Sequence, residues 1–381
     1  MELPSSFTTF LTAIRPTDDQ SKDLQTGHTT LRERLHKDPT LAPIIVSDFL
    51  QGSYRRATAV RPKSGKRSDV DIIVVTKLDS EEYTPEAALQ VFVPFLDKHY
   101  KDKYEIQGRS IGIELSYVDL DLVITAAPSE AEQGILKAQS VTTDETLEEV
   151  KDWRLVQSWV PYSERRTLSG QLLMKAAVTE AEWKSVPLLI PDREAGCWTE
   201  TDPLAQIRWT WDMNKAANTH YVNVVKALKW WRRVKHATPA YPKGYPVEHL
   251  IGQSCPEGIN SVAQGVTLTL EAITASYSLY AALKQVPVMP DHGVPTHDVL
   301  KRITGEDFAE FYNQVKEAAL IARRALDCET SHASSEAWQE LFGSKFPLSP
   351  EEGGKSGGFT PRNSETTIAG GRFAYTRGCF S

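Results

Sequence analysis

Apolar residues in the first third of the chain occur in short runs that have the length of β-strands. Strands are predicted over residues 44–49, 70–75, 104–107 and 111–125. In the second run, Ile72, Ile73, Val74 and Val75 follow one another with no polar residue between them. A strand that is covered on both faces has this continuous pattern, so residues 70–75 are predicted to lie inside a sheet.

Helical spacing of apolar residues is found near the N-terminus and dominates from Pro203 onward. The chain up to about Arg34 is predicted to be mainly helical. Further helices are predicted over residues 85–100, 218–235, 266–283, 306–326 and 336–342. The last of them is expected to begin after Ser334-Ser335 and to stop at Gly343, because serines cap helices and glycine ends them. Residues 129–190 are polar and mixed, and no element is predicted there.

This order of elements predicts an α+β protein in two lobes. Residues 1–200 are expected to form a core around a mixed β-sheet, with the N-terminal helix as part of it. Residues 201–347 are expected to form a helical lobe. Residues 348–381 contain the glycine-rich stretch EEGGKSGG and are expected to be a flexible tail.

Composition limits the classes of function. The chain has 381 residues, 40% of them hydrophobic, which is enough for two packed lobes. A net charge of −7 argues against a protein that coats nucleic acid, so no stable nucleic-acid partner is expected. No apolar run approaches the roughly 20 residues of a membrane span, and no membrane association is expected. The cysteines at positions 197, 255, 328 and 379 stand far apart, which fits reduced thiols in a cytoplasmic protein.

Two aspartates, Asp69 and Asp71, stand at the start of the apolar strand. Alternate residues of a strand share a face, so these side chains are predicted to project together, about 7 Å apart along the backbone. A strand with one wet face would also explain them. The apolar run that follows argues against this alternative, because two like charges beside buried residues repel each other and need a compensating cation.

A second acidic strand offers matching groups. In residues 118–123, Asp119 and Asp121 share one face and apolar residues occupy the other. Carboxylates from neighbouring strands are the ligands that Mg²⁺ or Mn²⁺ prefers. Two such ions, about 3.5–4 Å apart, clamp the attacking and leaving oxygens of a phosphoryl transfer. The sequence therefore predicts a two-ion site that holds a triphosphate.

The segment Gln51-Gly52-Ser53 follows the first predicted strand and is assigned to nucleotide binding. Gly52 allows the backbone to approach phosphate closely, and successive N–H groups in such a turn form an anion-binding nest. The Ser53 hydroxyl adds a donor. A plain turn is the alternative, and the aspartates on the later strands are what favour phosphate binding.

The helix predicted over residues 218–235 carries Lys226, Lys229 and Arg233 on one face. A solvated basic face would account for them, but Lys229, assisted by Lys226, would also neutralise the β and γ phosphates of a nucleotide. Tyr245 lies just downstream, near a predicted turn. Its ring would stack on a nucleobase, or it would simply pack against the start of the next helix.

Five motifs, taken together, resemble a known family: GSY, DVD, DLDLVITAAP, VKALKWW and GYPVEHL. The chain resembles the polymerase-β-like nucleotidyltransferases and is most similar to the bacterial CD-NTases, relatives of cyclic GMP-AMP synthase and oligoadenylate synthase. The resemblance covers roughly residues 1–347. It implies a bilobed enzyme that uses NTPs, ATP among them, to make a cyclic di- or trinucleotide second messenger with release of pyrophosphate, in anti-phage (CBASS) operons.

The resemblance also implies roles for single residues. The catalytic metal ligands it implies are Asp69, Asp71 and Asp121, with Asp119 as the second choice for the third position. The nucleotide contacts it implies are Gly52, Ser53, Lys229 and Tyr245. Two departures stand out: Gly244 occupies a position where relatives often have a phosphate-touching serine, and the long spacing from Ser53 to Asp69 predicts a longer hairpin at residues 63–66.

Partners and alternatives complete the set of expectations. In the resembling family some operons encode a ubiquitin-transfer-like protein that acts on the C-terminus of the synthase, and this tail offers it a substrate. One alternative function is a template-independent nucleotidyltransferase that acts on RNA or on a protein hydroxyl. A second is a non-catalytic nucleotide-binding regulator, which the intact set of aspartates argues against.

Overall fold

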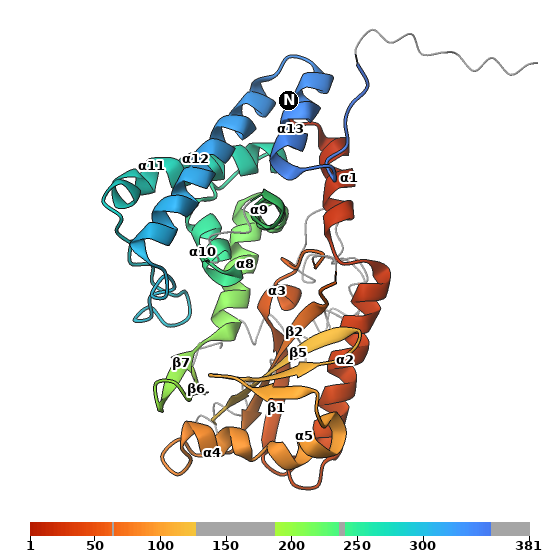
Figure 1. Cartoon of the computed structure of the whole chain (residues 1–381), viewed down its shortest axis with the longest axis vertical. Coiled ribbons are helices and arrows are strands. Elements are labelled where there is room, and N and C mark those ends of the chain that lie inside the picture. Colours follow the sequence, from red (N-terminus) through yellow and green to blue (C-terminus); the bar gives the residue numbers. More distant parts are fainter. Residues whose placement is uncertain (63–64, 127–186, 236–240, 352–381) are drawn as a thin grey trace, which may run out of the picture.

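The protein has a lower lobe built on a β-sheet and an upper lobe of helices (Figure 1). The computed structural model describes residues 1–62, 65–126, 187–235 and 241–351. The expectations for residues 129–186, for the tip of the hairpin at 63–64 and for the tail from residue 352 onward fall outside these ranges. The predicted α+β class is confirmed.

The sheet of the lower lobe is mixed, with the strand order β1-β2-β5-β4-β3. Its strands are β1 (Ile45–Gln51), β2 (Ser68–Thr76), β3 (Tyr104–Ile106), β4 (Ile111–Glu114) and β5 (Val118–Thr125). β2 and β5 are parallel, and the other neighbours are antiparallel. The prediction of one strand over 111–125 was wrong, because a tight turn, in which the Leu115 N–H bonds to the Val118 carbonyl, reverses the chain.

β2 is covered on both faces, as its apolar run predicted. Residues 72–75 are fully buried. One face of β2 and β5 packs against α2 (Asp18–Lys37), and the other packs against β6 (Leu188–Asp192) and α8 (Pro203–Ala216). β6 pairs with β7 (Cys197–Thr201) in a two-stranded sheet, and its Leu189 also forms an isolated antiparallel bridge with Ala126, which directly follows β5. Ile73 and Val75 belong to the face that meets α8, and Asp69 and Asp71 continue that same face toward the start of the strand.

The helix predicted over residues 85–100 is divided into α4 (Pro85–Gln90) and α5 (Val93–Tyr100). The break follows from Pro94, whose ring lacks an N–H and clashes with the preceding turn. Proline is tolerated only in the first turn of a helix, and Pro94 indeed lies in the first turn of α5.

The upper lobe contains the later helices and also the first one. Its helices are α1 (Pro4–Ile14), α9 (Tyr221–Lys235), α10 (Gly244–Ser254), α11 (Val262–Ala282), α12 (Gly305–Asp327) and α13 (Ser331–Phe342). Phe7 and Phe10 of α1 pack against the rings of Trp338, Phe342 and Phe346. The predicted core of residues 1–200 includes the N-terminal helix, but α1 packs on the helical lobe, as Figure 1 shows. The spacing of apolar residues along α1 predicts a helix with one apolar face, but it does not specify which distant part of the chain that face packs against.

α13 begins earlier than predicted. Its N-cap is Thr330, whose hydroxyl accepts the N–H of Ala333, and Ser334 and Ser335 lie inside the helix. The predicted end at Gly343 is confirmed, with φ of 76° at this residue. Within the described ranges, no helix combines the length and the apolar character that crossing a membrane would require.

Candidate active site

The parallel pairing of β2 and β5 aligns the four predicted aspartates. Asp69 is in register with Asp119, and Asp71 is in register with Asp121. Since neighbouring strands lie about 4.8 Å apart, these carboxylates form two adjacent pairs on one face of the sheet. The expectation that two separate strands bring their aspartates together is met by this geometry.

The pair of Asp71 and Asp121 is the more deeply placed one. Burial, and then the charges of Asp121 and Asp69, raise the pKa of Asp71 to about 7. Burial also raises the pKa of Asp121, with a contribution from the charge of Asp69 and an opposing hydrogen bond from Ser110. The Oδ1 atom of Asp121 is buried and has no hydrogen-bond partner among the described residues. Carboxylates in this situation favour either a proton or a cation.

Asp119 has a different environment. Its Oδ1 atom accepts a hydrogen bond from Arg67 Nε at 2.6 Å, and Arg67 also pairs with Glu114 at 3.0 Å. The side chain of Asp119 is about a third exposed, at 36%. Asp119 is therefore neutralised by a neighbouring cation, whereas no cation in the described part of the chain pairs with Asp121. This contrast favours Asp121 over Asp119 as the third ligand.

Within the described residues, the side chains do not form a ready-made group of three metal ligands, but the donor types at this position suit a divalent cation. Asp69, Asp71 and Asp121 lie on two adjacent strands, repel one another and leave a buried oxygen without a partner. Hard oxygen donors of this kind suit Mg²⁺ or Mn²⁺. When bound, such ions polarise phosphoryl oxygens and neutralise the charge that develops on them.

The Gly52-Ser53 pair begins a short helix, α3 (Gly52–Arg55), directly after β1. Gly52 has a φ of 71°, in the left-handed region. A β-carbon at this position would lie only 1.7 Å from Asp71 Oδ2, so the backbone of Gly52 passes directly against the carboxylate. The predicted turn is thus the first turn of a helix. Glycine is required there because its φ is positive and because a β-carbon would collide with Asp71.

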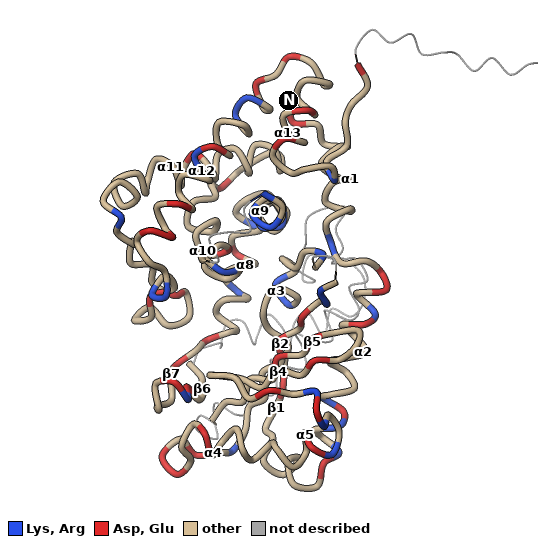
Figure 2. Tube along the Cα trace, viewed as in Figure 1, with Lys and Arg blue, Asp and Glu red and all other residues tan. Residues whose placement is uncertain are grey.

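A pocket of about 250 Å³ brings Ser53, Asp69, Lys229 and Arg233 to one space. Lys66 and Arg67 also line it, so its charged lining residues are basic except for Asp69, which suits the binding of a triphosphate. Figure 2 shows basic residues on α9, which lies in the part of the upper lobe near the lower lobe. Arg233 was placed on this face by the sequence but was not given a role.

Lys226 does not line the described pocket. Its side chain is buried, with 1% exposure, and burial together with the charges of Arg15 and Lys229 lowers its pKa to about 7. The exposure of Lys229 is only 12%, so neither lysine belongs to a solvated surface. The two lysines have different surroundings although they share a helix face.

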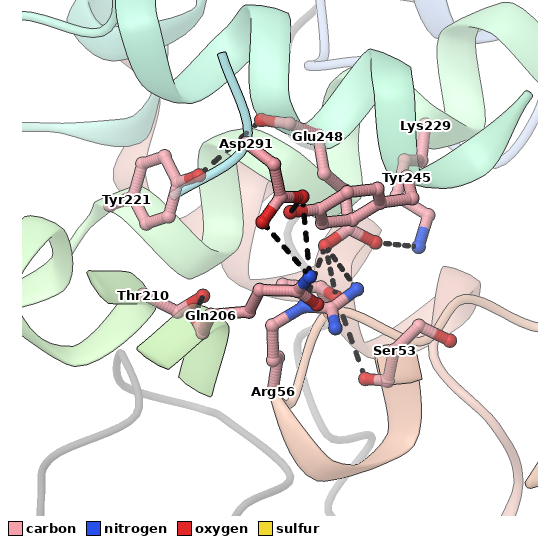
Figure 3. Close-up of polar contacts among 10 residues, drawn as sticks. Ser53, Arg56, Gln206, Thr210, Tyr221, Lys229, Tyr245, Glu248 and Asp291 are labelled. Atoms are coloured by element: carbon pink, nitrogen blue, oxygen red, sulfur yellow. Dashed lines mark hydrogen bonds and ion pairs between the residues drawn. The ribbon is translucent and has the colours of Figure 1, made fainter. Parts of the chain in front are cut away.

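Tyr245 is the second residue of α10 and does not lie in a turn. Its hydroxyl donates to Asp291 Oδ2 at 2.7 Å, and the Arg56 guanidinium lies over its ring at 5.4 Å (Figure 3). The hydroxyl therefore has a structural partner that the sequence did not indicate. The preceding residue is Gly244, where relatives often have a serine. A β-carbon at this position would meet no atom within 4 Å, so there is open space where that serine side chain would lie.

Sequence reasoning missed a buried acidic residue beside Lys229. Glu248 of α10 accepts hydrogen bonds from Lys229 Nζ at 2.6 Å and from Arg56 at 3.2 Å (Figure 3). Burial alone would raise the pKa of Glu248, but the charges of Lys229 and Arg56 outweigh it and hold the pKa below its usual range. A glutamate in the stretch VEHLI, in which three of the other four residues are apolar, was the available signal.

Comparison with known proteins identifies the relatives of this chain. The profile of the Second Messenger Oligonucleotide or Dinucleotide Synthetase domain matches residues 1–129. The chain is 48% identical over 382 residues to a probable cyclic AMP-AMP-GMP nucleotide synthase of Salmonella paratyphi B, with 98% of this chain and 100% of that protein covered. It is 49% identical, with the same coverage, to the cyclic AMP-AMP-GMP synthase of Enterobacter hormaechei.

A solved structure supports the fold. The CD-NTase of Bradyrhizobium diazoefficiens in complex with GTP superposes with a TM-score of 0.64 at 11% identity, covering 90% of this chain and 96% of that one. At this identity the likeness concerns the fold alone. The two full-length relatives at almost half identity carry the assignment: the chain belongs to the CD-NTase family of nucleotidyltransferases.

Proposed function

We propose that this enzyme makes a cyclic trinucleotide from two adenosine nucleotides and one guanosine nucleotide, using ATP and GTP. The observation that carries the proposal is the full-length identity of 48% and 49% to two proteins named as cyclic AMP-AMP-GMP synthases. This narrows the earlier expectation of a cyclic di- or trinucleotide.

In the proposed mechanism, two Mg²⁺ or Mn²⁺ ions would be held by Asp69, Asp71 and Asp121 and would supply Lewis-acid activation of the α-phosphate. Asp121, whose pKa burial raises, is the candidate that assists deprotonation of the attacking hydroxyl. Ser53, Lys229 and Arg233 would bind the triphosphate in the pocket they line. Gln51 and Gly52 would supply backbone contacts, and Tyr245 would stack on a base.

The biological setting is also a proposal. The family resemblance supports a cytoplasmic enzyme in anti-phage (CBASS) signalling, and it supports a ubiquitin-transfer-like partner for the expected tail, residues 348–381. Deletion of residues 359–381 tests the partner. Cyclic product formation by the purified enzyme should be unchanged, while phage protection in cells should be lost. Loss of product formation in vitro would contradict the proposal.

The chemistry is tested by incubating the purified protein with labelled ATP, with labelled GTP and with both together, in the presence of Mg²⁺. A phosphatase-resistant product that contains both labels in the ratio of two adenosines to one guanosine is expected only from the mixture. The double variant Asp69→Asn/Asp71→Asn should give none while remaining folded. A labelled RNA or labelled protein would instead support the alternative acceptor, and a protein that binds NTPs without product would support the regulator.

A further inference from the structure

The carboxylate of Glu248 joins three segments that are far apart in the sequence. Its Oε2 atom accepts from Arg56 Nε and Nη2, both at 3.2 Å, and from the Thr58 hydroxyl at 3.0 Å. Its Oε1 atom accepts from Lys229 Nζ at 2.6 Å. Arg56 and Thr58 follow α3 in the lower lobe, and Lys229 and Glu248 lie on α9 and α10 of the upper lobe.

All three charged groups of this cluster are withdrawn from water. Side-chain exposure is 7% for Arg56, 7% for Glu248 and 12% for Lys229. A buried carboxylate is tolerated only when it is paired and hydrogen-bonded, and Glu248 has four donors. Two cations share one anion, so the cluster has one positive charge in excess. Among its members, Lys229 is the cation that lines the pocket with Ser53 and Asp69.

From this geometry we propose that Glu248 is a positioning residue that fixes the Lys229 ammonium at the triphosphate pocket. A lysine side chain has four rotatable bonds, and ordering it when a ligand binds costs conformational entropy. The bond to Glu248 orders it in advance. Through Arg56, whose guanidinium lies over the ring of Tyr245 at 5.4 Å, the same carboxylate supports the proposed base-stacking residue (Figure 3).

A purely electrostatic role leads to the opposite expectation. If only total charge mattered, replacing Glu248 by the neutral glutamine would leave two cations beside the pocket and would tighten triphosphate binding. If Glu248 positions Lys229, the same change weakens it, because the repelling cations lose their common anchor. This inference rests on the proposed nucleotide site, and the two expectations differ in sign.

The test compares the binding of AMP with that of an ATP analogue whose α–β bridge cannot be cleaved. The variant Glu248→Gln should lose affinity for the analogue by about tenfold or more, the effect of losing a hydrogen bond to a charged group, while its affinity for AMP changes much less. Lys229→Met should do the same. The double variant should be no weaker than either single variant, because both remove one interaction. Additive losses, or an unchanged preference for the analogue over AMP, would overturn the proposal.

Asp48→Asn is the matched control. Asp48 is also a buried carboxylate with two basic partners, Arg32 and His36, but it lies on β1 away from the pocket. Its replacement should lower stability and leave the preference for the triphosphate unchanged. A parallel loss in Asp48→Asn would show that destabilisation alone explains the effect.

A second variant keeps the proposal falsifiable if Glu248→Gln does not fold. Glu248→Asp retains the counter-charge but shortens the side chain by one methylene group, so the carboxylate no longer reaches Lys229 and Arg56 together. If Glu248 positions Lys229, the Glu248→Asp variant should lose its preference for the ATP analogue over AMP. If only the balance of charge matters, the variant should keep that preference. A wild-type protein that binds the analogue no better than AMP would contradict the proposed nucleotide site itself, whereas failure of the variants alone would concern only Glu248.

Discussion

Gly52 and Asp71 are packed so closely that a β-carbon on Gly52 would lie 1.7 Å from the carboxylate oxygen Oδ2. Gly52 begins α3 directly after β1, and the last residue of β1, Gln51, is in register with Asp71 of the antiparallel strand β2. The backbone that is assigned to phosphate binding is therefore in direct contact with a proposed metal ligand. Neither group can shift without moving the other.

This contact predicts that Gly52→Ala abolishes nucleotide transfer and lowers stability. An alanine at this positive φ destabilises the folded state by about 1–2 kcal/mol, and its β-carbon also displaces Asp71. Gly258→Ala is the control, because Gly258 has a φ of 69° with no atom within 4 Å of the added carbon. It should lose similar backbone stability and keep its activity. Product formation and thermal unfolding of both variants are the measurements, and an active Gly52→Ala would contradict the contact's importance.

The third ligand is predicted to be Asp121. Asp121→Asn should reduce cyclic product formation by several orders of magnitude, while Asp119→Asn should cost far less, because Asp119 is already neutralised by Arg67. Initial rates at saturating ATP, GTP and Mg²⁺ provide the comparison. The reverse order of effects would identify Asp119 as the ligand.

The contribution of Asp71 to the stability of the metal-free enzyme is predicted to fall as pH rises from about 4 to about 7. The pKa of Asp71 is raised to about 7 in the folded state, so the folded protein holds a proton that the unfolded chain has already released in this interval. Asp71→Asn removes this dependence and should be more stable than the wild type at pH 8, by an amount of the order of 2 kcal/mol.

Urea unfolding between pH 5 and pH 8 in EDTA measures this effect, with Asp119→Asn as the control that retains the slope. Added Mg²⁺ should stabilise the wild type more at pH 8 than at pH 6, because the ligands must be deprotonated to bind it. An equal Mg²⁺ effect at both pH values would argue against Asp71 as a ligand.

The buried Lys226 gives a pH dependence of the opposite sign. Its pKa is lowered to about 7, so the unfolded chain binds a proton that the folded state gives up, and stability should rise between about pH 7 and pH 10. Lys226→Met should remove this rise and be more stable than the wild type at pH 7.5.

Lys226→Met should also raise the KM for ATP less than Lys229→Met does. The exposed Lys235 of the same helix supplies the control variant for stability, Lys235→Met. If Lys226→Met raised the KM as much as Lys229→Met, Lys226 would contact phosphate after all.

Tyr245 is predicted to have two separable functions. Tyr245→Ala should weaken nucleotide binding by about 1–3 kcal/mol through loss of a base–aromatic stack. Tyr245→Phe keeps the ring but leaves Asp291 without its hydroxyl donor, so it should lower the free energy of unfolding by about 1 kcal/mol and leave nucleotide binding nearly unchanged. Isothermal titration and urea unfolding separate the two effects. A large loss of binding in Tyr245→Phe would mean that the hydroxyl, and not the stack, is what the nucleotide needs.

The sequence by itself indicated the strands of the larger sheet, several of the helices and the strand face that carries charge, but it gave no individual prediction for β6, β7, α8 or α10. Strand periodicity is a local property, so it was enough to place Asp69 beside Asp71 and Asp119 beside Asp121. Local chemistry also predicted the helix end at Gly343. It failed where a single residue overrode a longer pattern, as at Pro94, and where a tight turn interrupted the run from 111 to 125.

Only the tertiary structure decided how these pieces meet. The parallel register of β2 with β5 opposes Asp71 to Asp121, and the pairing with Arg67 sets Asp119 apart. The packing of α9 and α10 against the loop after α3 places Glu248 between Lys229 and Arg56, and separates the surroundings of Lys226 from those of Lys229. These relationships join residues that are tens to hundreds of positions apart. They depend on which apolar surfaces pack together and which charged groups pair in the folded protein. The periodicity within one segment does not determine these long-range contacts.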